Sequence, residues 1–264
     1  DSKKLRPGIK SLEQTQDRLT ERRLLQKLDI PCAQYIELKN EEDFKYSISN
    51  FGESIIKTRR FGYDGKGQTS INKNTNIDND ISSLFNEAII EKKIPFEFEF
   101  SQVSCRDTYG NISHFPLTRN VHENHILKHS YAPLKLDNDL EKYSKEITKK
   151  ILIELGHIGV LTVEFFKAGE DIIVNEIAPR VHNSGHLTIN AYNVSQFENH
   201  IRAVCFLEKI PTKKLSNAKM VNLIGNEIEP YRLNNKLSKN EFFFDYLKKE
   251  IKDKRKMGHI TTLI

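Results

Sequence analysis

Apolar residues recur at helical spacing in several stretches of the chain. Between Leu12 and Leu28 the leucines recur at roughly helical spacing, and Pro31 follows, so the pattern predicts a single helix that ends in a turn. Further helices are predicted at about Ile81 to Ile90, Asn138 to Leu155, Ser195 to Leu207 and Phe242 to Lys248.

Short apolar runs predict strands between these helices. Phe96 to Phe100 alternates phenylalanine with glutamate, as a half-buried strand does, so its glutamates share one face. Tyr109, Gly110 and Asn111 predict a hairpin turn. The other predicted strands are Ser54 to Lys57, Thr69 to Ile71, Ile158 to Phe166, Asp171 to Ile177 and Lys219 to Ile224, with a turn at Ala168-Gly169-Glu170.

The composition is ordinary for a soluble globular protein. The chain has 264 residues, 38% hydrophobic and 29% charged, which suits one large domain or two smaller ones. Its net charge is +5, but 41 basic residues are interspersed with 36 acidic ones, so the excess does not by itself indicate a nucleic-acid-binding surface. No apolar run approaches membrane-spanning length. Cys32, Cys105 and Cys205 are too far apart for a zinc site or a disulfide framework, which favours a reducing cytoplasm.

A glycine-rich segment joins the first two predicted strands. Three glycines fall within the six residues from Gly62 to Gly67, and Lys57, Arg59, Arg60 and Lys66 surround them. Because glycine lets backbone amides approach phosphate oxygens and these cations neutralise charge, the segment fits a lid over phosphates. It is neither a P-loop nor a dinucleotide fingerprint, because a strand follows it. Taken alone, an ordinary mobile hairpin explains it equally well.

Two carboxylates lie on the adjacent strands of a predicted hairpin. Glu164 and Glu176 each stand among apolar residues, and a carboxylate on a buried strand needs a partner. With Asn175 they form an oxygen-ligand set that suits Mg²⁺ bridging nucleotide phosphates. A salt bridge to a nearby Lys or Arg is an equally good interpretation of these residues alone.

The loop that follows the second strand of this hairpin is dense in polar side chains. Five of the seven positions from Arg180 to His186 are polar, which favours a site over a solvated loop. Arg180 offers a fork for a carboxylate, bicarbonate or phosphate, and His182 and His186 could donate hydrogen bonds or move protons. Zinc is a weaker interpretation, since no cysteine or acidic ligand stands at a useful spacing.

Other candidates are uninformative when taken singly. A lone strand glutamate such as Glu99 usually belongs to a solvated face, and a lone histidine such as His122 is usually structural. The basic C-terminal cluster is by default a solvated face or a nonspecific polyanion patch. It contains Lys248, Lys249, Lys252, Lys254, Arg255 and Lys256.

Taken in order, these segments resemble the ATP-grasp superfamily and, within it, the 5-(carboxyamino)imidazole ribonucleotide synthase family. The matching motifs are Gln16-Asp17-Arg18, Lys57 with Phe61 to Gln68, Phe115 to His122, Asn175 to His186 and Arg255 to His259. The resemblance runs from about Pro7 to the end. It implies an α+β ATP-grasp fold at residues 1–207, with a small lobe at about 30–93 and a large lobe at about 94–207 that clasp ATP. A small β-rich C-terminal domain is expected at 208–264. The family's usual N-terminal Rossmann-like domain is expected to be missing from this chain.

The resemblance also implies an activity. The expected enzyme is a ligase that uses ATP and Mg²⁺ to carboxylate 5-aminoimidazole ribonucleotide with bicarbonate, through carboxyphosphate, in de novo purine biosynthesis. Its products are 5-(carboxyamino)imidazole ribonucleotide, ADP and phosphate. A cytoplasmic homodimer is expected, with no nucleic-acid or membrane partner.

Residue roles follow from the same resemblance. The implied nucleotide contacts are Arg18, Lys57, Gly62, Tyr63, Asp64, Gly65, Lys66, Gly67, Gln68, Glu91, Lys92, Lys93, Ile94, Glu99, His122, Asn175 and Glu176. Glu164 and Glu176 match magnesium ligands. The catalytic positions around bicarbonate and the aminoimidazole are Arg180, His182, Asn183, Ser184 and His186, and ribonucleotide contacts are Tyr63, Asp64, Arg180, Lys249, Arg255 and Lys256. The hinge Glu91 to Ile94 and residue Arg119 depart from the commoner family residues.

Two kinds of alternative compete with this interpretation. Another ATP-grasp ligase, such as a formate-using glycinamide ribonucleotide transformylase or a biotin-carboxylase-like protein, is the nearest, but the His-Asn-Ser-Gly-His string and the Arg-Lys-Met-Gly-His ending favour the imidazole enzyme. A noncatalytic nucleotide-binding module is disfavoured by the intact Glu164 and Glu176. A nucleic-acid-binding protein is disfavoured because basic and aromatic residues are not interleaved.

Overall fold

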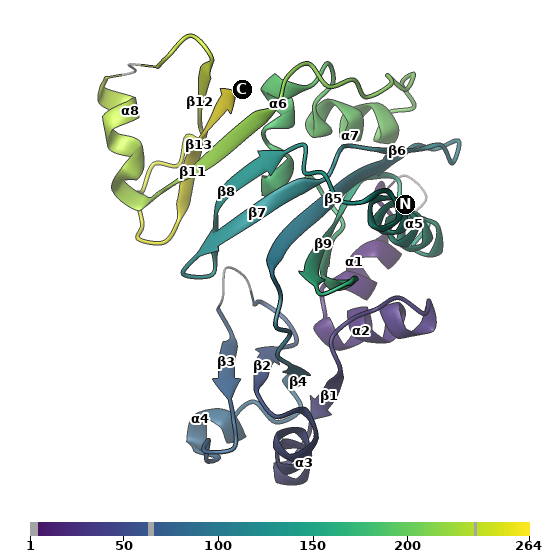
Figure 1. Ribbon diagram of the computed structural model, residues 1–264, viewed down its shortest axis with the longest axis vertical. Coiled ribbons are helices and arrows are strands. Elements are labelled where there is room, and N and C mark those ends of the chain that lie inside the picture. Colours follow the sequence, from purple (N-terminus) through teal and green to yellow (C-terminus); the bar gives the residue numbers. More distant parts are fainter. Residues whose placement is uncertain (1–4, 63–65, 235–236) are drawn as a thin grey trace.

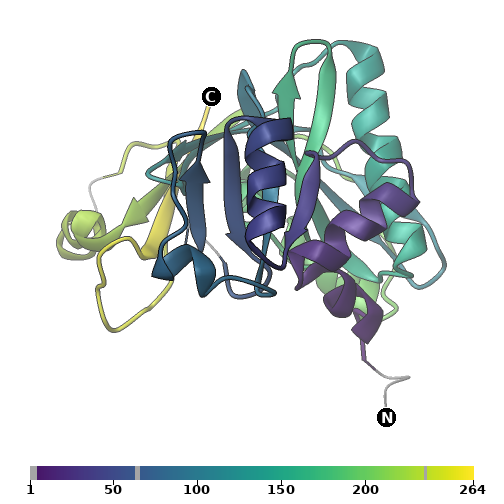
Figure 2. The ribbon, with the colours of Figure 1, turned by 90° about the horizontal axis from the view of Figure 1, so that it is seen from below.

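Two sheets organise the chain, and the computed structural model describes residues 5–62, 66–234 and 237–264 (Figure 1). The small sheet has the order β1 (Tyr35–Leu38), β4 (Ala88–Lys92), β2 (Ser54–Thr58), β3 (Gln68–Ile71). All its strand pairs are antiparallel. Helix α3 (Glu41–Phe51) lies across its outer face, as Figure 2 shows, and the short α4 (Asn79–Ser82) precedes β4.

The large sheet is also antiparallel and has nine strands. Its order is β10 (Asp171–Ala178), β9 (Gly159–Ala168), β5 (Phe98–Arg106), β7 (Thr118–Glu123), β8 (Ile126–Ala132), β11 (Ala218–Ile224), β13 (Lys256–Leu263), β12 (Glu241–Asp245), and β6 (Ile112–His114) pairs with β5. The remaining elements are α1 (Ile9–Thr15), α2 (Arg18–Lys27), α5 (Asn138–Glu154), η2 (Asn183–Gly185), α6 (Thr188–Ala191), α7 (Gln196–Val204), η3 (Gly225–Ile228) and α8 (Glu229–Leu233).

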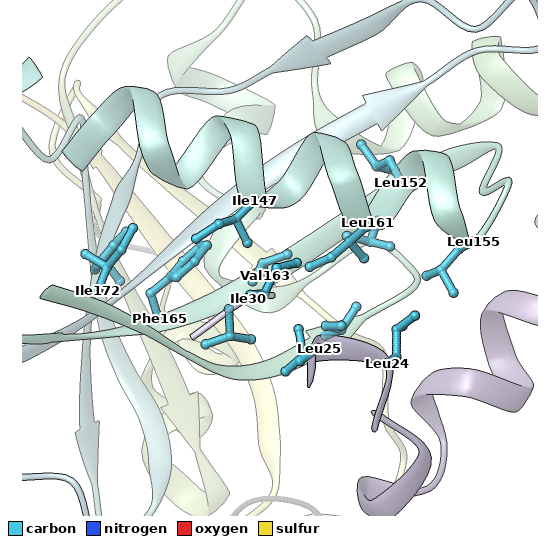
Figure 3. Packing of buried hydrophobic residues seen from close by; sticks show 14 of the residues in the cluster. Leu24, Leu25, Ile30, Ile147, Leu152, Leu155, Leu161, Val163, Phe165 and Ile172 are labelled. Carbon is cyan, nitrogen blue, oxygen red and sulfur yellow. The ribbon is translucent and has the colours of Figure 1, made fainter. Parts of the chain in front are cut away.

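The main core lies between α5, α2 and one face of the large sheet (Figure 3). Ile147 and Ile151 of α5 pack over strand residues such as Phe165, and all three side chains are at most 1% exposed. Phe165 also stacks on Phe100 of β5 at 5.0 Å between ring centroids. Each such buried side chain contributes about 1.5–3 kcal/mol relative to exposure. The opposite face of these strands carries a second apolar cluster, which includes Val103, Cys105 and Val160, and also polar side chains such as that of Glu164.

Most predicted elements are confirmed. The strand–glycine segment–strand unit is β2 and β3, the long helix is α5, and the two carboxylate-bearing strands are β9 and β10. The Tyr109-Gly110-Asn111 turn joins β5 to β6, because the Asp107 N–H donates to the Asn111 carbonyl at 3.0 Å. The strand predicted at Phe96 to Phe100 begins at Phe98 as β5. The helix at Ser195 to Leu207 is α7, and the strand at Lys219 to Ile224 is β11.

Three predicted helices are wrong in whole or in part. The single helix from Leu12 to Leu28 is two helices, because the extended residue Asp17 caps α2 with its side chain. The helix over Ile81 to Ile90 is only the short α4, and its second half is β4, where β-branched isoleucines pair inside the small sheet. The segment Phe242 to Lys248 begins as edge strand β12, which pairs with β13.

The large sheet contains strands from both sides of the predicted boundary at residue 207, because β8 pairs with β11. The division into domains at 207 and 208 stays a prediction. Within the part of the chain that is described, no helix has both the length and the apolar character needed to cross a membrane.

Candidate active site

A cavity of about 320 Å³ is lined by α1, α2, the segment after β2 and the end of β10. Arg18, Gly62, Glu176 and Arg180 all contribute to its wall. Arg18 Nη1 lies 3.9 Å from Glu176 Oε2. Four predicted site residues from distant segments therefore surround one space, with cationic and anionic groups facing each other.

Asp17 fixes how the chain presents Arg18 to this cavity. Its carboxylate accepts a hydrogen bond from the Leu19 N–H at 2.9 Å, which caps α2, and pairs with Arg59 at 2.8 Å and Arg60 at 3.3 Å. Burial raises the pKa of Asp17, but its bonds with Arg59 outweigh burial and leave that pKa below its ordinary value. The Arg18 N–H donates to the Arg59 carbonyl at 2.9 Å. The start of α2 is thus tied to the segment after β2.

Lys57 and Glu91 form a buried ion pair within the small sheet. Lys57 Nζ lies 2.6 Å from one Glu91 oxygen, and Arg22 Nε lies 2.6 Å from the other. Burial would raise the pKa of Glu91, but Arg22 and Lys57 together lower it to about 2. Burial lowers the pKa of Lys57. Glu91 therefore holds the predicted phosphate-binding ammonium group of Lys57 in a fixed position.

The glycine segment is a tight connection that needs glycine at one position at least. Gly67 has φ +69°, and a Cβ built there would lie 2.3 Å from Thr58 Oγ1. The Thr58 N–H donates to the Gly67 carbonyl at 2.8 Å, which closes the base of the segment. Gly62 is half-buried, Lys66 is exposed, and Gln68 begins β3. The predicted contacts Tyr63, Asp64 and Gly65 lie outside the described residues.

Glu164 and Glu176 are direct cross-strand partners on β9 and β10, so both carboxylates project from the same face of the large sheet. The register shifts between Val174 and Glu176, which makes Asn175 the extra residue of a bulge. Glu164 is 8% exposed. Burial, and then the charge of Glu176, raise the pKa of Glu164 to about 8. Two neighbouring carboxylates that repel each other in this way are oxygen donors that fit Mg²⁺.

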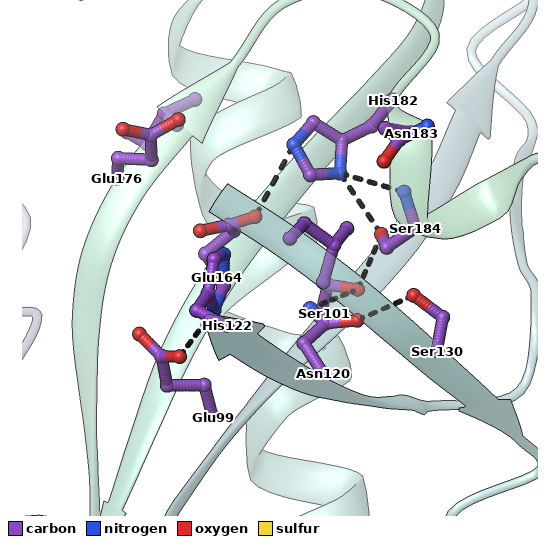
Figure 4. A network of polar contacts seen from close by, with 12 residues as sticks. Glu99, Ser101, Asn120, His122, Ser130, Glu164, Glu176, His182, Asn183 and Ser184 are labelled. Carbon is purple, nitrogen blue, oxygen red and sulfur yellow. Dashed lines mark hydrogen bonds and ion pairs between the residues drawn. The ribbon is translucent and has the colours of Figure 1, made fainter. Parts of the chain in front are cut away.

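A buried chain of polar contacts leads away from Glu164 (Figure 4). His182 Nε2 lies 3.2 Å from Glu164 Oε1, and His182 Nδ1 lies 2.9 Å from Ser184 Oγ. Burial lowers the pKa of His182 to about 3, so its ring is neutral at neutral pH. The Ser184 N–H points to Nδ1, which places the ring proton on Nε2, directed at Glu164. Ser184 Oγ in turn lies 2.7 Å from Ser101 Oγ.

Glu99 and His122 lie on the same face of the sheet as Glu164. The Glu99 carboxylate contacts His122 Nδ1 directly. Burial alone would lower the pKa of His122, but the bond with Glu99 raises it above its ordinary value. Glu99 and His122, which were uninformative when taken singly, therefore form one charged pair. Its position on the same face as Glu164 suits the binding of a polar part of a nucleotide.

The loop after β10 is tied to the C-terminal strands by paired amides. Asn183 Nδ2 donates to Asn222 Oδ1 at 3.0 Å, and Asn222 Nδ2 donates to Asn183 Oδ1 at 2.5 Å. Asn183 Nδ2 also donates to the Tyr246 hydroxyl at 3.3 Å. This hydroxyl oxygen lies 3.0 Å from His259 Nδ1. The ring of His186 packs on those of Tyr246 and His259 at 5.9 and 5.4 Å between centroids. The C-terminal strands thus complete the wall of the site.

The predicted ribose-phosphate residues differ in where they lie. Burial dominates the pKa shifts of Glu164 and His182, but the charge of Lys256 also acts on both groups, which places Lys256 near the carboxylates. Arg255 is half-buried, and Lys249 is exposed.

The predicted adenine segment, Glu91 to Ile94, leaves the small sheet at the end of β4. The side chain of Glu91 is committed to its ion pairs, and the N–H groups of Lys92 and Lys93 donate to Gln34 and Glu53 carbonyls at 2.9 and 3.0 Å. A contact with adenine would therefore use a carbonyl group or the N–H of Ile94.

Several buried residues that support the site were missed from the sequence. Gln196 brackets His182, because its Oε1 accepts from the His182 N–H at 2.9 Å and its Nε2 donates to the His182 carbonyl at 2.6 Å. Ser101, Asn120 and Ser130 continue the polar chain on neighbouring strands. These three carry no distinctive sequence signal, because polar residues are common in their strands: β7, for example, reads Thr-Arg-Asn-Val-His-Glu.

Fold and site together define an ATP-grasp ligase. The chain matches the ATP-grasp domain family over residues 23–197 and the phosphoribosylaminoimidazole carboxylase C-terminal domain family over residues 218–264. Within that class, the chain belongs to the N5-carboxyaminoimidazole ribonucleotide synthase family. The expected fold and family are thereby confirmed.

The similarity to relatives extends over nearly the whole chain. The N5-carboxyaminoimidazole ribonucleotide synthase of Bacillus subtilis (strain 168) is 37% identical over 257 residues, which cover 96% of this chain and 68% of that protein. The enzyme from Staphylococcus aureus, solved with ADP, superposes with a TM-score of 0.90 at 35% identity and covers 97% of this chain and 69% of its own. The enzyme from Aspergillus clavatus, solved with ADP and 5-aminoimidazole ribonucleotide, gives 0.88 at 25% identity, with 98% and 70% covered.

Proposed function

We propose that this chain catalyses the ATP-dependent carboxylation of 5-aminoimidazole ribonucleotide to N5-carboxyaminoimidazole ribonucleotide, the reaction of its family in purine biosynthesis, with bicarbonate as the carboxyl source. A bicarbonate oxygen attacks the γ-phosphorus of ATP, which gives carboxyphosphate and ADP. The exocyclic amine of the ribonucleotide then attacks the carboxyl carbon, phosphate leaves and one proton is released. The single observation that supports this most is the cross-strand pair of Glu164 and Glu176, with Glu176 beside Arg18 at the cavity.

Glu164 and Glu176, with Asn175 beside them, are the residues that would hold Mg²⁺. When bound, Mg²⁺ would neutralise phosphate oxygens of ATP and the charge that develops during transfer. The ion would also offset the burial and the repulsion from Glu176 that together raise the pKa of Glu164. His182 donates to Glu164 and so orients that carboxylate.

The nucleotide would lie between the small sheet and the carboxylate face. Arg18, Lys57 and the amides of the glycine segment would bind phosphates, because fixed cations next to backbone N–H groups stabilise the transferred phosphoryl group. Lys57 is held for this purpose by Glu91. Glu99 and His122 would contact the ribose side of the nucleotide. Closure of the glycine segment over this space would exclude water, which hydrolyses carboxyphosphate.

The second substrate would bind on the C-terminal side of the carboxylates. Arg180, Asn183 and His186 belong to the loop after β10, as do the buried His182 and Ser184. Arg180 offers a fork to bicarbonate or carboxyphosphate. Lys256, with Arg255 and Lys249 towards the surface, would bind the ribose phosphate.

We also propose a cytoplasmic homodimer. The three cysteines are free, which suits a reducing compartment. Light scattering on the purified protein tests the assembly: about twice the chain mass of 30.7 kDa supports the dimer, and 30.7 kDa contradicts it.

The release of ADP tests the reaction. The purified protein is incubated with Mg²⁺-ATP and bicarbonate, with and without 5-aminoimidazole ribonucleotide. Strong stimulation of ADP release by the ribonucleotide, together with its carboxylation, is expected. Binding of ATP without any effect of the ribonucleotide would overturn the substrate assignment and leave another ATP-grasp reaction or a noncatalytic binder.

A further inference from the structure

Two consecutive residues of α2 form hydrogen bonds with the main chain on either side of Glu176. Arg22 Nη2 donates to the Asn175 carbonyl at 2.6 Å, and Glu21 Oε2 accepts from the Ile177 N–H at 2.9 Å. Arg22 and Glu21 also bond to each other at 2.8 Å. They are 0% and 2% exposed. A charged pair buried this completely is held by specific partners, and here those partners are main-chain groups that flank a predicted metal ligand.

β10 is the edge strand of the large sheet, so main-chain groups on its outer side need partners other than a strand, and the bulge in β10 adds to them. The ladder between β10 and β9 is interrupted between Val174 and Glu176, so Asn175 has no cross-strand partner in the register. A bulge leaves main-chain N–H and C=O groups outside the ladder and bends the strand. The groups that bind this free main chain therefore help to set the direction of the neighbouring side chain. Arg22 and Glu21 provide these bonds from a helix in place of a strand.

Arg22 also connects the bulge to the small sheet. Its Nε lies 2.6 Å from a Glu91 oxygen, and the other Glu91 oxygen lies 2.6 Å from Lys57 Nζ. One rigid guanidinium thus joins the carbonyl preceding Glu176 to the carboxylate that holds Lys57. A lysine ammonium at position 22 could retain a charge contact but could not reach these separately placed partners with one planar fork.

We propose that Glu21 and Arg22 are positioning residues that aim the Glu176 carboxylate and set its place relative to Lys57. This rests on the proposed function, because it assigns the pair to the metal-dependent binding of the nucleotide phosphates. Their bonds run to main-chain groups of β10, to each other and to Glu91, so the role assigned to them is an indirect one. Outer partners of this kind, when removed, cost about 10- to 100-fold in metal affinity.

The test compares the same substitution at neighbouring positions. Arg22→Lys removes the fork, whereas Arg23→Lys changes a side chain that is 61% exposed and pairs with Glu37 at 3.4 Å. Calorimetric titration with ADP is done with and without Mg²⁺. The affinity of Arg22→Lys for metal-free ADP is expected to lie within about twofold of the wild-type affinity. The gain in ADP affinity that Mg²⁺ gives should be about tenfold smaller than in wild type. Arg23→Lys should match wild type in both titrations.

A second pair of variants covers the case in which Arg22→Lys does not fold. Glu21→Ala removes the acceptor for the Ile177 N–H, and Glu21→Gln keeps an oxygen there. Loss of the Mg²⁺ effect in Glu21→Ala with retention in Glu21→Gln supports the proposal. Wild-type strengthening by Mg²⁺ in folded Arg22→Lys, or in both Glu21 variants, overturns it.

Failure of the proposed function would look different. If the wild-type protein binds Mg²⁺-ADP but does not release ADP in response to 5-aminoimidazole ribonucleotide, the proposed reaction is refuted. The positioning role of Glu21 and Arg22 could then still be tested by the same titrations.

Discussion

Lys57 Nζ lies 2.6 Å from Glu91 Oε2 inside the small sheet, where the two side chains are 6% and 3% exposed. Arg22 approaches the same carboxylate from α2, so among the described residues Glu91 is the acidic partner of Lys57 and one of two for Arg22. Glu91→Gln would leave both cations in a buried site with a neutral partner. We expect a loss of about 3–5 kcal/mol in the free energy of unfolding, measured in urea.

Glu53→Gln is the matched control for this first prediction. Glu53 pairs with Lys93 at 3.0 Å, but its side chain is 71% exposed. An exposed pair is worth about 0–1 kcal/mol, so this variant should unfold like wild type. Equal losses of unfolding free energy in the two variants would show that burial does not make the Lys57–Glu91 pair more stabilising than an exposed pair.

Glu176→Gln separates stability from activity. It removes one charge from a pair of facing carboxylates, so the fold should be kept and the melting temperature without Mg²⁺ should not fall. ADP formation should drop at least about 100-fold, because a metal ligand is lost. Mg²⁺-ADP should raise the melting temperature of wild type but not that of the variant. Retained turnover would refute the metal role.

The sequence suggested roles for residues of the site but did not reveal the residues that support them. Long motifs around Gly62 to Gln68 and Asn175 to His186 allowed residue roles to be assigned, and the structure brings several of them to one cavity. Gln196 and Asn222 carry no local pattern, because what makes them important is a partner far away along the chain. Such partners exist only once the strands are paired.

The errors in the predicted elements have a similar cause. Phe242 to Phe244 form a strand because β13 offers an edge, and Ile89 and Ile90 do so because β2 and β1 lie on either side. Periodicity in a short apolar run does not separate these outcomes from helix. The break at Asp17 was visible in principle, since aspartate is a preferred N-cap.

Acid should destabilise the protein through His157. This side chain is fully buried between Ser11 Oγ and the Val160 carbonyl, each 3.0 Å away, and burial lowers its pKa from 6.5 to about 4. The unfolded chain therefore binds a proton that the folded chain excludes, and stability falls as the pH drops from about 6.5 towards 4. Between about pH 7.5 and pH 5 this histidine should account for about 2 kcal/mol.

His157→Gln tests this contribution in urea unfolding at the two pH values. The variant can lose stability at both, but the difference between them should shrink by about 2 kcal/mol. His125→Gln changes an exposed histidine and should keep the wild-type difference. An unchanged difference in His157→Gln would contradict the assignment of the acid sensitivity to this residue.

Substitution of two glycines with similar φ angles can separate the effect of backbone strain from that of a steric clash. Gly67 and Gly52 have φ +69° and +73°, but only at Gly67 would a Cβ meet another atom, Thr58 Oγ1 at 2.3 Å. Both alanine variants should lose about 1–2 kcal/mol from the positive φ. Only Gly67→Ala should also raise the KM for ATP, and Thr58→Ala should partly restore it. An equal change of KM in Gly52→Ala would exclude a local role for the glycine segment.

Asn222 should affect the second substrate more than ATP. It is fully buried and exchanges two hydrogen bonds with Asn183, which lies in the loop assigned to the ribonucleotide. Asn222→Ala leaves the Asn183 amide without that partner, at a cost of about 1–3 kcal/mol, and frees it to turn. The KM for 5-aminoimidazole ribonucleotide should rise about tenfold or more, while that for ATP changes little. Asn226→Ala, an exposed change nearby, should leave both values as in wild type. Parallel rises in both KM values for Asn222→Ala would instead point to a general loosening of the large sheet.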